Sequence, residues 1–492
     1  MTDNQKAYRQ VFKGASLFGG VQIINILAGI LRSKFAAIFL GPAGVGIMGV
    51  LNSTIHLITS IFKLGLDTSS IKEIAFANKL EDKRNVSNVI YNLKRLLWVT
   101  GVLGTVVTSI LSPFLSEIAF QSKSFTFSFI WISVAVLFKQ LTFGNMAILQ
   151  GLRKLKKLAM VNLYSSVCSV FIVVPLYYFL GLEAIIPTII LTTFLGYLIS
   201  KYFTLSVEIE SDHKSLKNVF HEGKPMIKLG VTLSVGSIIT LFVAYLIQVY
   251  ITNVGGLTEV GYYNVGMIII NSYVGLIFES MSKDYFPRLS EIIKDIKSVQ
   301  RTVTQQAMVV VLLITPVIVL FLTFAEYFIV ILYSKAFLPV LLFINIAIMG
   351  TLFKAVSWSL GYVIIANGDS SVFIKTAIGF NVLLLVINIF GYSNYGLLGL
   401  GVSYIIYYFL HLVIISLIMK FRYKFVFVSE FIKVYFVCLL LVFSTFCITY
   451  IGDVLLKSFL LVFLILISSV FTIYNLNKKL DVKSFIKEKF NK

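Results

Sequence analysis

The chain has 492 residues, of which 58% are hydrophobic and 13% are charged. Its mean hydropathy is +0.92. A water-soluble fold of this size cannot bury so much apolar surface, so the composition excludes one and predicts an outer face in contact with lipid. The formal net charge is nevertheless +20, from 42 Lys and Arg against 22 Asp and Glu. Basic residues beside apolar segments are typical of a membrane surface and argue against nucleic acid as a partner.

The cysteines and the N-terminus remove further classes. Cys168, Cys438 and Cys447 lie inside apolar runs without CxxC or His-rich spacing. We interpret each as a small buried hydrophobic residue and predict no disulfide framework and no metal site. The N-terminal residues MTDNQKAYRQVFKG are polar and continue into an apolar span without an A-x-A cleavage site, so we expect no removable signal peptide.

Apolar segments of roughly 20 residues recur along the whole chain, each long enough to cross a bilayer as a helix. The shorter alternating segments of a β-barrel are not what this pattern resembles. We therefore predict an all-α polytopic membrane protein with about 14 transmembrane helices. In chain order the predicted spans are 11–40, 43–66, 96–116, 125–149, 159–180, 184–206, 229–252, 262–282, 303–325, 339–366, 373–391, 397–419, 431–451 and 457–475.

The positions of the cations predict the orientation of these spans. If the N-terminus is cytoplasmic and the spans alternate, 34 of the 42 Lys and Arg residues fall in cytoplasmic segments and 3 on the opposite side. Such a bias follows the positive-inside rule and predicts that both termini are cytoplasmic. The remaining five cations fall within spans and are Arg32, Lys34, Lys63, Lys139 and Lys354.

An internal repeat divides the chain. Residues 13–50 resemble residues 228–265 at a shift of 215. The matched pairs are Lys13 with Lys228, Gly41 with Gly256, Val45 with Val260, Gly46 with Gly261 and Val50 with Val265, and Gln150-Gly151 corresponds to Asn367-Gly368 at a shift of 217. We predict two pseudo-symmetric, parallel six-helix bundles and two additional helices. The predicted domains are an N-terminal lobe (1–210), a C-terminal lobe (211–420) and a C-terminal pair of helices with a basic cytoplasmic tail (421–492).

Ionisable side chains inside spans are costly and usually face a hydrated cavity. Lys139 and Lys354 lie near mid-span, and Arg32 belongs to a polar stripe in the first span, so we predict that these three cations line a central cavity. Lys63 lies close enough to a span end to snorkel to the interface, and stripes of small residues also fit simple helix packing. Further predicted cavity residues are Lys63, His56, Asn25 and Gln248, and Asp67 and Glu279 are candidates for ion coupling.

The surplus of cations within the spans favours an anionic substrate, and phosphate groups are natural partners of Lys and Arg. No catalytic residues and no cofactor are predicted, although coupling to H⁺ or Na⁺ stays open. The chain has no GxxxxGK[ST] motif, so ATP hydrolysis by this chain is not expected.

Four segments carry a resemblance to a known family: LGPAGVGIMGV, MSKDYFPRLSE, LYSKAFLPV and FKAVSWSLGYVIIANGDSSVF. They resemble the O-antigen translocases, the Wzx-type lipid-linked oligosaccharide flippases of the MOP exporter superfamily, over about residues 10–425. The resemblance implies a MATE-like fold with alternating access in the bacterial inner membrane. It also implies a substrate, an O-antigen or similar surface polysaccharide repeat unit linked to undecaprenyl diphosphate, which is moved from the cytoplasmic to the periplasmic leaflet.

The partners implied by this resemblance are the lipid-linked oligosaccharide, membrane lipids, a polysaccharide polymerase and a chain-length regulator. The alternative function is a cation-coupled MATE-type exporter of drugs or metabolites. A third class, a polytopic polymerase or acyltransferase, would need a large periplasmic loop or paired His and Asp residues. The predicted exoplasmic loops are short and His56 and His411 have no such companions, so we do not predict an enzyme.

Overall fold

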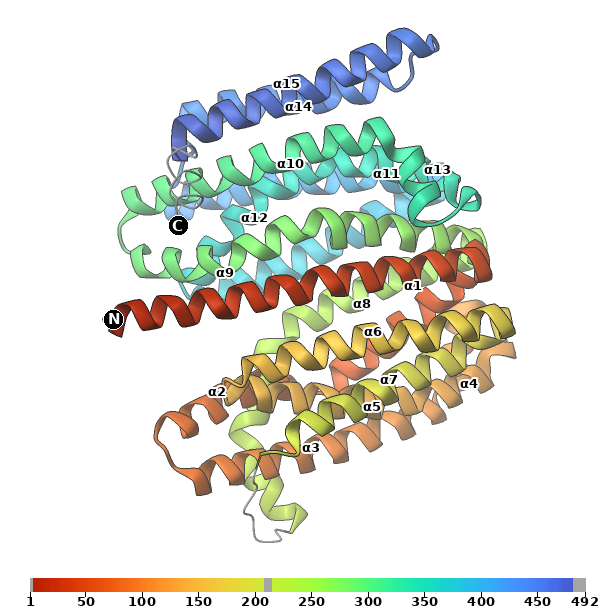
Figure 1. The fold of residues 1–492 in the computed structure, drawn as a ribbon, viewed down its shortest axis with the longest axis vertical. Helices are drawn as coiled ribbons and strands as arrows, with labels where there is room; N and C mark the ends of the chain where they lie inside the picture. Colours follow the sequence, from red (N-terminus) through yellow and green to blue (C-terminus); the bar gives the residue numbers. More distant parts are fainter. Residues whose placement is uncertain (1–2, 208–214, 481–492) are drawn as a thin grey trace. The chain divides into compact units, whose positions relative to one another are not determined.

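The computed structural model describes the backbone of residues 3–207 and 215–480, and the side chains within these ranges except 3–20, 272–274, 276, 279–284 and 479–480. Every regular element in this part is helical (Figure 1). Ten of the helical stretches that the structure describes are long and apolar enough to cross a membrane. The predicted all-α polytopic fold is confirmed, whereas the count of 14 crossings stays a prediction.

Residue contacts divide the chain into two compact units, which are described separately. Unit 1 is Met1–Gly261 with Leu332–Ser334, and unit 2 is Tyr262–Ile331 with Lys335–Lys492. The predicted lobe boundaries at residues 210 and 420 differ from this division and remain a prediction.

Unit 1 is built from seven helices and the first part of an eighth. Helix α1 packs against α6, and α5 packs against α2, α3 and α7. The helices are α1 (Asp3–Phe62), α2 (Leu66–Lys79), α3 (Lys83–Ile110), α4 (Ser112–Phe120), α5 (Thr126–Gly151), α6 (Leu155–Leu180), α7 (Ile185–Thr204) and α8 (Leu216–Ile268), with short 3₁₀ turns at Lys123–Phe125 and Gly181–Ala184.

Unit 2 continues from the end of α8. Helix α13 packs against α11 and α12, and α14 packs against α15. The helices are α9 (Gly275–Ile292), α10 (Ile296–Leu332), α11 (Leu341–Ala347), α12 (Thr351–Ala366), α13 (Ser370–Tyr423), α14 (Ser429–Ile448) and α15 (Val454–Leu480). A π-helical turn, η3 (Ile269–Val274), joins α8 to α9, and 3₁₀ turns cover Lys335–Val340 and Ile348–Gly350.

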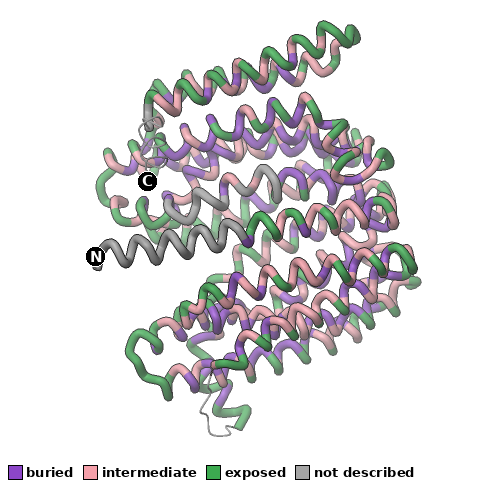
Figure 2. The backbone as a smooth tube through the Cα atoms, in the orientation of Figure 1, coloured by how far each residue is buried: buried purple, intermediate pink, exposed green. Residues whose placement is uncertain are grey.

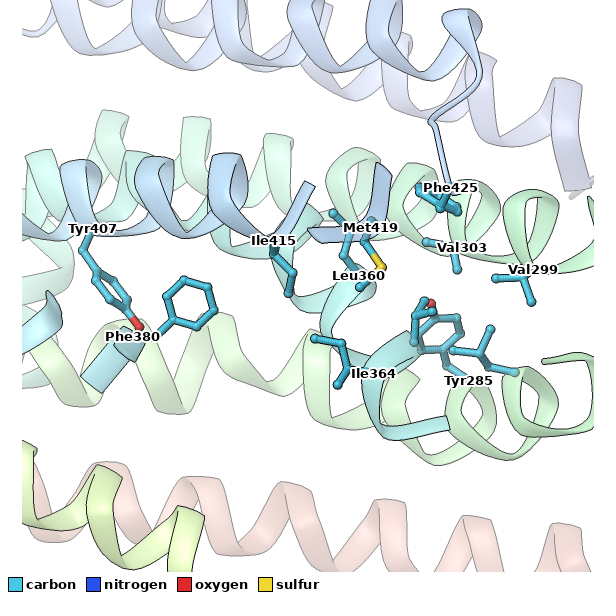
Figure 3. Close-up of a cluster of buried hydrophobic side chains, with 12 residues drawn as sticks. Tyr285, Val299, Val303, Leu360, Ile364, Phe380, Tyr407, Ile415, Met419 and Phe425 are labelled. Carbon is cyan, nitrogen blue, oxygen red and sulfur yellow. The ribbon is translucent and has the colours of Figure 1, made fainter. Parts of the chain in front are cut away.

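Unit 2 buries one continuous apolar cluster, shown in Figure 3. Tyr285 from α9, Leu360 from α12 and Met419 from α13 are fully or almost fully buried in it. The outer surfaces are different: Phe179 is 78% exposed and Leu455 is 84% exposed. Figure 2 shows exposed residues recurring along the helices, and apolar side chains exposed on this scale are expected where lipid is the solvent.

Four of the long stretches contain 42 to 56 residues, about twice what one bilayer crossing needs. Each is interrupted by a glycine with positive φ, at Gly41, Gly181, Gly256 or Gly396. Each glycine lies between two spans that the sequence analysis separated. The interruptions therefore give each long stretch the length and the break of a two-span hairpin.

The backbone repeats at the interval seen in the sequence. Gly41 has φ 65° and ψ −176°, and Gly256, 215 residues later, has φ 84° and ψ 179°. Gly181 (54°, −129°) and Gly396 (55°, −136°) form a second pair with the same spacing. These conformations are essentially restricted to glycine. The repeat thus extends to the local conformation of the chain.

The first pair of breaks lies in a reciprocal contact within unit 1. A Cβ atom added to Gly46 would lie 2.0 Å from the Leu257 carbonyl oxygen. A Cβ atom added to Gly261 would lie 2.0 Å from the Pro42 carbonyl oxygen. Since 257 and 261 are 42 and 46 shifted by 215, residue and partner exchange roles between the repeats. This reciprocity is the signature of a local pseudo-two-fold axis.

Two predictions about individual segments were wrong. The polar stretch after the second span contains a helix, α2, which packs on α3 and α5 through buried residues such as Leu66 and Ile74. Of the three cysteines, only Cys438 is buried, while Cys168 is partly exposed and Cys447 is exposed. Cys447 lies on a helix face that does not pack against protein, so its apolar sequence neighbours did not indicate burial.

The start of α13 is held by a charged cap. Asp369 accepts hydrogen bonds from the Val372 backbone N–H at 3.3 Å and from Arg422 Nε at 2.8 Å. Tyr423 donates a third at 3.1 Å. The Arg422 hydrogen bond is the main reason why the pKa of the Asp369 carboxyl is lowered. The ionised form is therefore favoured by the folded state.

We expect this cap to make unfolding pH-dependent. A lowered folded-state pKa stabilises the protein above the unfolded-state pKa of about 3.9, and that stabilisation is lost as the pH falls through the folded-state pKa. Asp369→Asn keeps the cap but not the charge, so the drop in Tm between pH 6 and pH 3 should be smaller than in the wild type. Thermal unfolding in detergent measures this, and Arg422→Gln should reproduce the effect. An unchanged pH dependence in both variants would contradict the assignment.

Candidate functional site

Unit 1 contains a cavity of about 270 Å³ that is lined by two cations. Arg32 belongs to α1 and Lys139 to α5. None of the described residues that line the cavity is acidic. Hydroxyl groups from α6 and α7 form much of the remaining wall, contributed by Tyr177, Thr188, Thr192 and Thr193. The cavity thus combines positive charge with neutral hydrogen-bonding groups.

The two cations differ in how they are held. Arg32 Nη1 donates a hydrogen bond to Ser169 Oγ at 2.9 Å, which fixes part of the guanidinium group. Within the described part of the chain, Lys139 Nζ has no hydrogen-bond or ion-pair partner. The Lys139 ammonium group therefore keeps its donors for a ligand or for water.

Unit 2 carries a second intramembrane lysine in a different setting. Lys354 Nζ, from α12, donates a hydrogen bond to Asn271 Oδ1 at 3.2 Å. It also lies 5.3 Å from the centroid of the Tyr408 ring and 5.8 Å from that of Phe278. Both distances are in the range of a cation–π interaction. Lys354 therefore has aromatic neighbours where Lys139 has hydroxyl groups.

The two lysines occupy equivalent positions of the repeat, because 139 and 354 differ by 215. Their neighbours are equivalent too. Asn271 corresponds to His56, which lies within electrostatic range of Lys139, and Tyr408 corresponds to Thr193 in the unit 1 cavity. Each half of the repeat thus places one lysine on its fourth predicted span.

The other predicted site residues are distributed as follows. Lys63 and Asp67 form an ion pair at 2.8 Å, so the charge of each is compensated by the other. Gln248 accepts a hydrogen bond from Ser53 at 2.9 Å. His56 is exposed, and Asn25 Oδ1 is buried without a hydrogen-bond partner among the described residues. The side chain of Glu279 lies outside the described residues.

Sequence reasoning missed the neighbours that define these settings. Ser169, Phe278 and Tyr408 were not identified, because helix rotation decides which of many similar residues contacts a cation. One signal was present in the sequence: the spacing of Lys139 and Lys354 equals the repeat interval.

Solved structures with the same architecture define the class of this fold. The lipid II flippase MurJ in an inward closed conformation matches with a TM-score of 0.65 and 13% identity, covering 94% of this chain and 99% of that one. An inward-facing multidrug resistance MATE family transporter of the MOP superfamily matches with a TM-score of 0.61 and 13% identity, over 83% and 98% of the two chains. The fold is thus that of a multi-pass membrane protein of the flippase and MATE transporter type.

A third similar structure is a MOP superfamily transporter from Pyrococcus furiosus, whose binding pocket is described as having reversed polarity. Its TM-score is 0.59 at 13% identity, over 84% of this chain and 96% of that one. A family model described as polysaccharide biosynthesis protein matches residues 36–342, and the chain belongs to this family. A comparison with curated proteins finds no match.

Proposed function

We propose that the protein is a flippase that moves an oligosaccharide linked to undecaprenyl diphosphate from the cytoplasmic to the periplasmic leaflet of the bacterial inner membrane. The observation that carries this proposal is the pair of equivalent lysines, Lys139 and Lys354, in surroundings without a recorded carboxylate partner among the described residues. Membership of the polysaccharide biosynthesis family supports a glycan-bearing substrate. The MurJ-like fold supports a substrate with a lipid tail.

In this proposal the cations bind the diphosphate. Arg32 and Lys139 donate to phosphate oxygens from the unit 1 cavity, and the hydroxyl groups of α7 contact the adjacent polar atoms. Lys354 contributes the equivalent charge from unit 2. Phosphate is well matched to such sites, because hydrogen bonds between a cation and an anionic oxygen are stronger than neutral ones. Asn25, His56, Lys63 and Gln248 are proposed to contact the remaining head group.

The membrane potential favours transport in this direction. Moving two negative charges outward across about 100 mV, negative inside, releases about 4–5 kcal/mol. An ion gradient is therefore not required for net export of the head group. If coupling exists, we propose Asp67 and Glu279 as its acids, with Asp67 already paired to Lys63.

Deletion of the gene is expected to trap the lipid-linked oligosaccharide in the cytoplasmic leaflet. Spheroplasts of the deletion strain would then contain the labelled glycolipid but expose little of it to a membrane-impermeant glycan-cleaving enzyme. Expression of the wild-type chain should restore cleavage. Lysed spheroplasts, in which both leaflets are accessible, are the control for the total amount.

The alternative exporter function gives the opposite pattern. If the chain is a MATE-type exporter, the deletion strain should flip the glycolipid normally and become sensitive to a drug or metabolite. Normal exposure of the glycolipid in the deletion strain, with no second flippase present, would overturn the proposal.

A further inference from the structure

Unit 2 contains a second polar cavity, of about 700 Å³, outside the site described above. Four cations line it, from α9 (Arg288), α10 (Lys297 and Arg301) and α15 (Lys478). Glu430 is the one acid among its described lining residues. The lining therefore has a net formal charge of about +3, which requires anions nearby.

Two buried hydrogen-bond donors add to this charge. Gln306 is 5% exposed and Thr304 is 8% exposed, and both line the cavity. Gln306 Nε2 and Thr304 Oγ1 have no hydrogen-bond partner among the described residues. A buried donor without an acceptor costs about 1–3 kcal/mol, so the cavity is built to receive acceptor atoms.

An apolar stripe leads away from the cavity along α10. It begins at Val309 in the cavity wall and continues at intervals of three or four residues, which keeps it on one helix face. Leu313, Val317, Leu320 and Phe324 form this stripe and are each 37–41% exposed. A ligand with an anionic head and an apolar tail matches both parts.

The helix that completes the cavity is attached to α10. Thr472 Oγ1 of α15 donates a hydrogen bond to the Leu312 carbonyl oxygen at 2.9 Å. The cavity thus lies where the two additional C-terminal helices meet α10. Its cations lie in segments that the sequence analysis predicts to be cytoplasmic.

We propose that this cavity binds the phosphate head group of an anionic phospholipid, with the acyl chains along the α10 stripe. Phosphate oxygens accept hydrogen bonds from Gln306 and Thr304, and the four cations compensate the negative charge. Basic pockets between transmembrane helices at the cytoplasmic surface are suited to such head groups. The lipid then holds α15 against α10. This assignment does not depend on the transported substrate.

Lipid binding to the purified full-length chain tests the proposal. Native mass spectrometry in detergent would compare phosphatidylglycerol with phosphatidylcholine of the same acyl chains. We expect phosphatidylglycerol to bind at least tenfold more tightly. The double substitution Lys297→Gln with Arg301→Gln should weaken phosphatidylglycerol binding about thirtyfold and leave phosphatidylcholine unchanged. Gln306→Leu should weaken it about fivefold, because a buried donor to phosphate is lost.

The matched control is Lys375→Gln with Lys420→Gln, which removes two exposed cations from unit 2 outside the cavity. It should change phosphatidylglycerol binding less than twofold. Equal binding of the two phospholipids, or equal losses in the test and control variants, would overturn the proposal. So would displacement of phosphatidylglycerol by inorganic diphosphate, or preferential binding of undecaprenyl diphosphate, since these identify a soluble anion or the substrate as the occupant.

Discussion

Replacing Lys139 or Lys354 by alanine is expected to abolish transport while the amount of inserted protein stays near normal. Each lysine is proposed to donate charge-assisted hydrogen bonds to the diphosphate, and such a bond contributes about 1.5–3 kcal/mol. Loss of either should lower transport about tenfold to a hundredfold. Complementation of a strain that lacks the flippase, together with the exposed glycolipid in spheroplasts, measures the effect.

Insertion should not suffer, because both substitutions remove a charge from an apolar span. A charged residue at the middle of a transmembrane helix costs about 2.5–3.5 kcal/mol on insertion scales. Lys139 has no recorded partner among the described residues, and Lys354 has one hydrogen bond, to Asn271. The folded state thus loses little when either is replaced.

Controls separate charge from other effects. Lys139→Arg and Lys354→Arg keep the charge and should retain most of the transport, whereas Lys375→Ala, at an exposed position, should have no effect. If both lysines contact one diphosphate, the double alanine variant should lose less than the two single losses combined. Full complementation by both single alanine variants would show that the cations do not bind the substrate.

The positions of the breaks between helices could be predicted from sequence, because glycines mark them. Gly41 and Gly256 adopt a conformation that other residues avoid, and both stand between apolar segments of bilayer length. Local chemistry alone was sufficient there. Helix α2 was not predicted, since its buried residues, such as Ile74, are mixed with charged ones and produce no apolar run.

The site was predicted less completely than the fold. The cost of an intramembrane charge identified Lys139 and Lys354 from the sequence alone. The ion pair of Lys63 with Asp67 was also accessible, because residues four apart share a helix face. The aromatic neighbours of Lys354 were not, because Tyr408 is one of many aromatic residues and only the rotation of α13 selects it.

The reciprocal glycine contact gives the largest expected effect on stability. Gly46→Ala is expected to lower the Tm by several degrees, because the new methyl group would lie 2.0 Å from the Leu257 carbonyl oxygen. Overpacking typically costs about 1–3 kcal/mol, and here the neighbour is backbone, which cannot rotate away. Gly261→Ala should have a similar effect through the Pro42 carbonyl oxygen.

Gly29→Ala is the matched control within the same helix, α1. A Cβ atom there would meet nothing within 4 Å, and alanine favours a helix by about 1 kcal/mol over glycine. The Tm of this variant should stay the same or rise slightly. Thermal unfolding of the purified variants in detergent compares all three, and a Tm for Gly46→Ala equal to that of Gly29→Ala would contradict the close contact.

The double variant distinguishes one shared contact from two independent defects. Because Gly46 and Gly261 press on each other's helices at the same place, one alanine already forces the two segments apart. The second alanine then meets a contact that is partly open, so the combined loss in Tm should be clearly smaller than the sum of the single losses. Additive losses would mean that the two glycines act separately, and the pseudo-two-fold contact between the repeats would have to be abandoned.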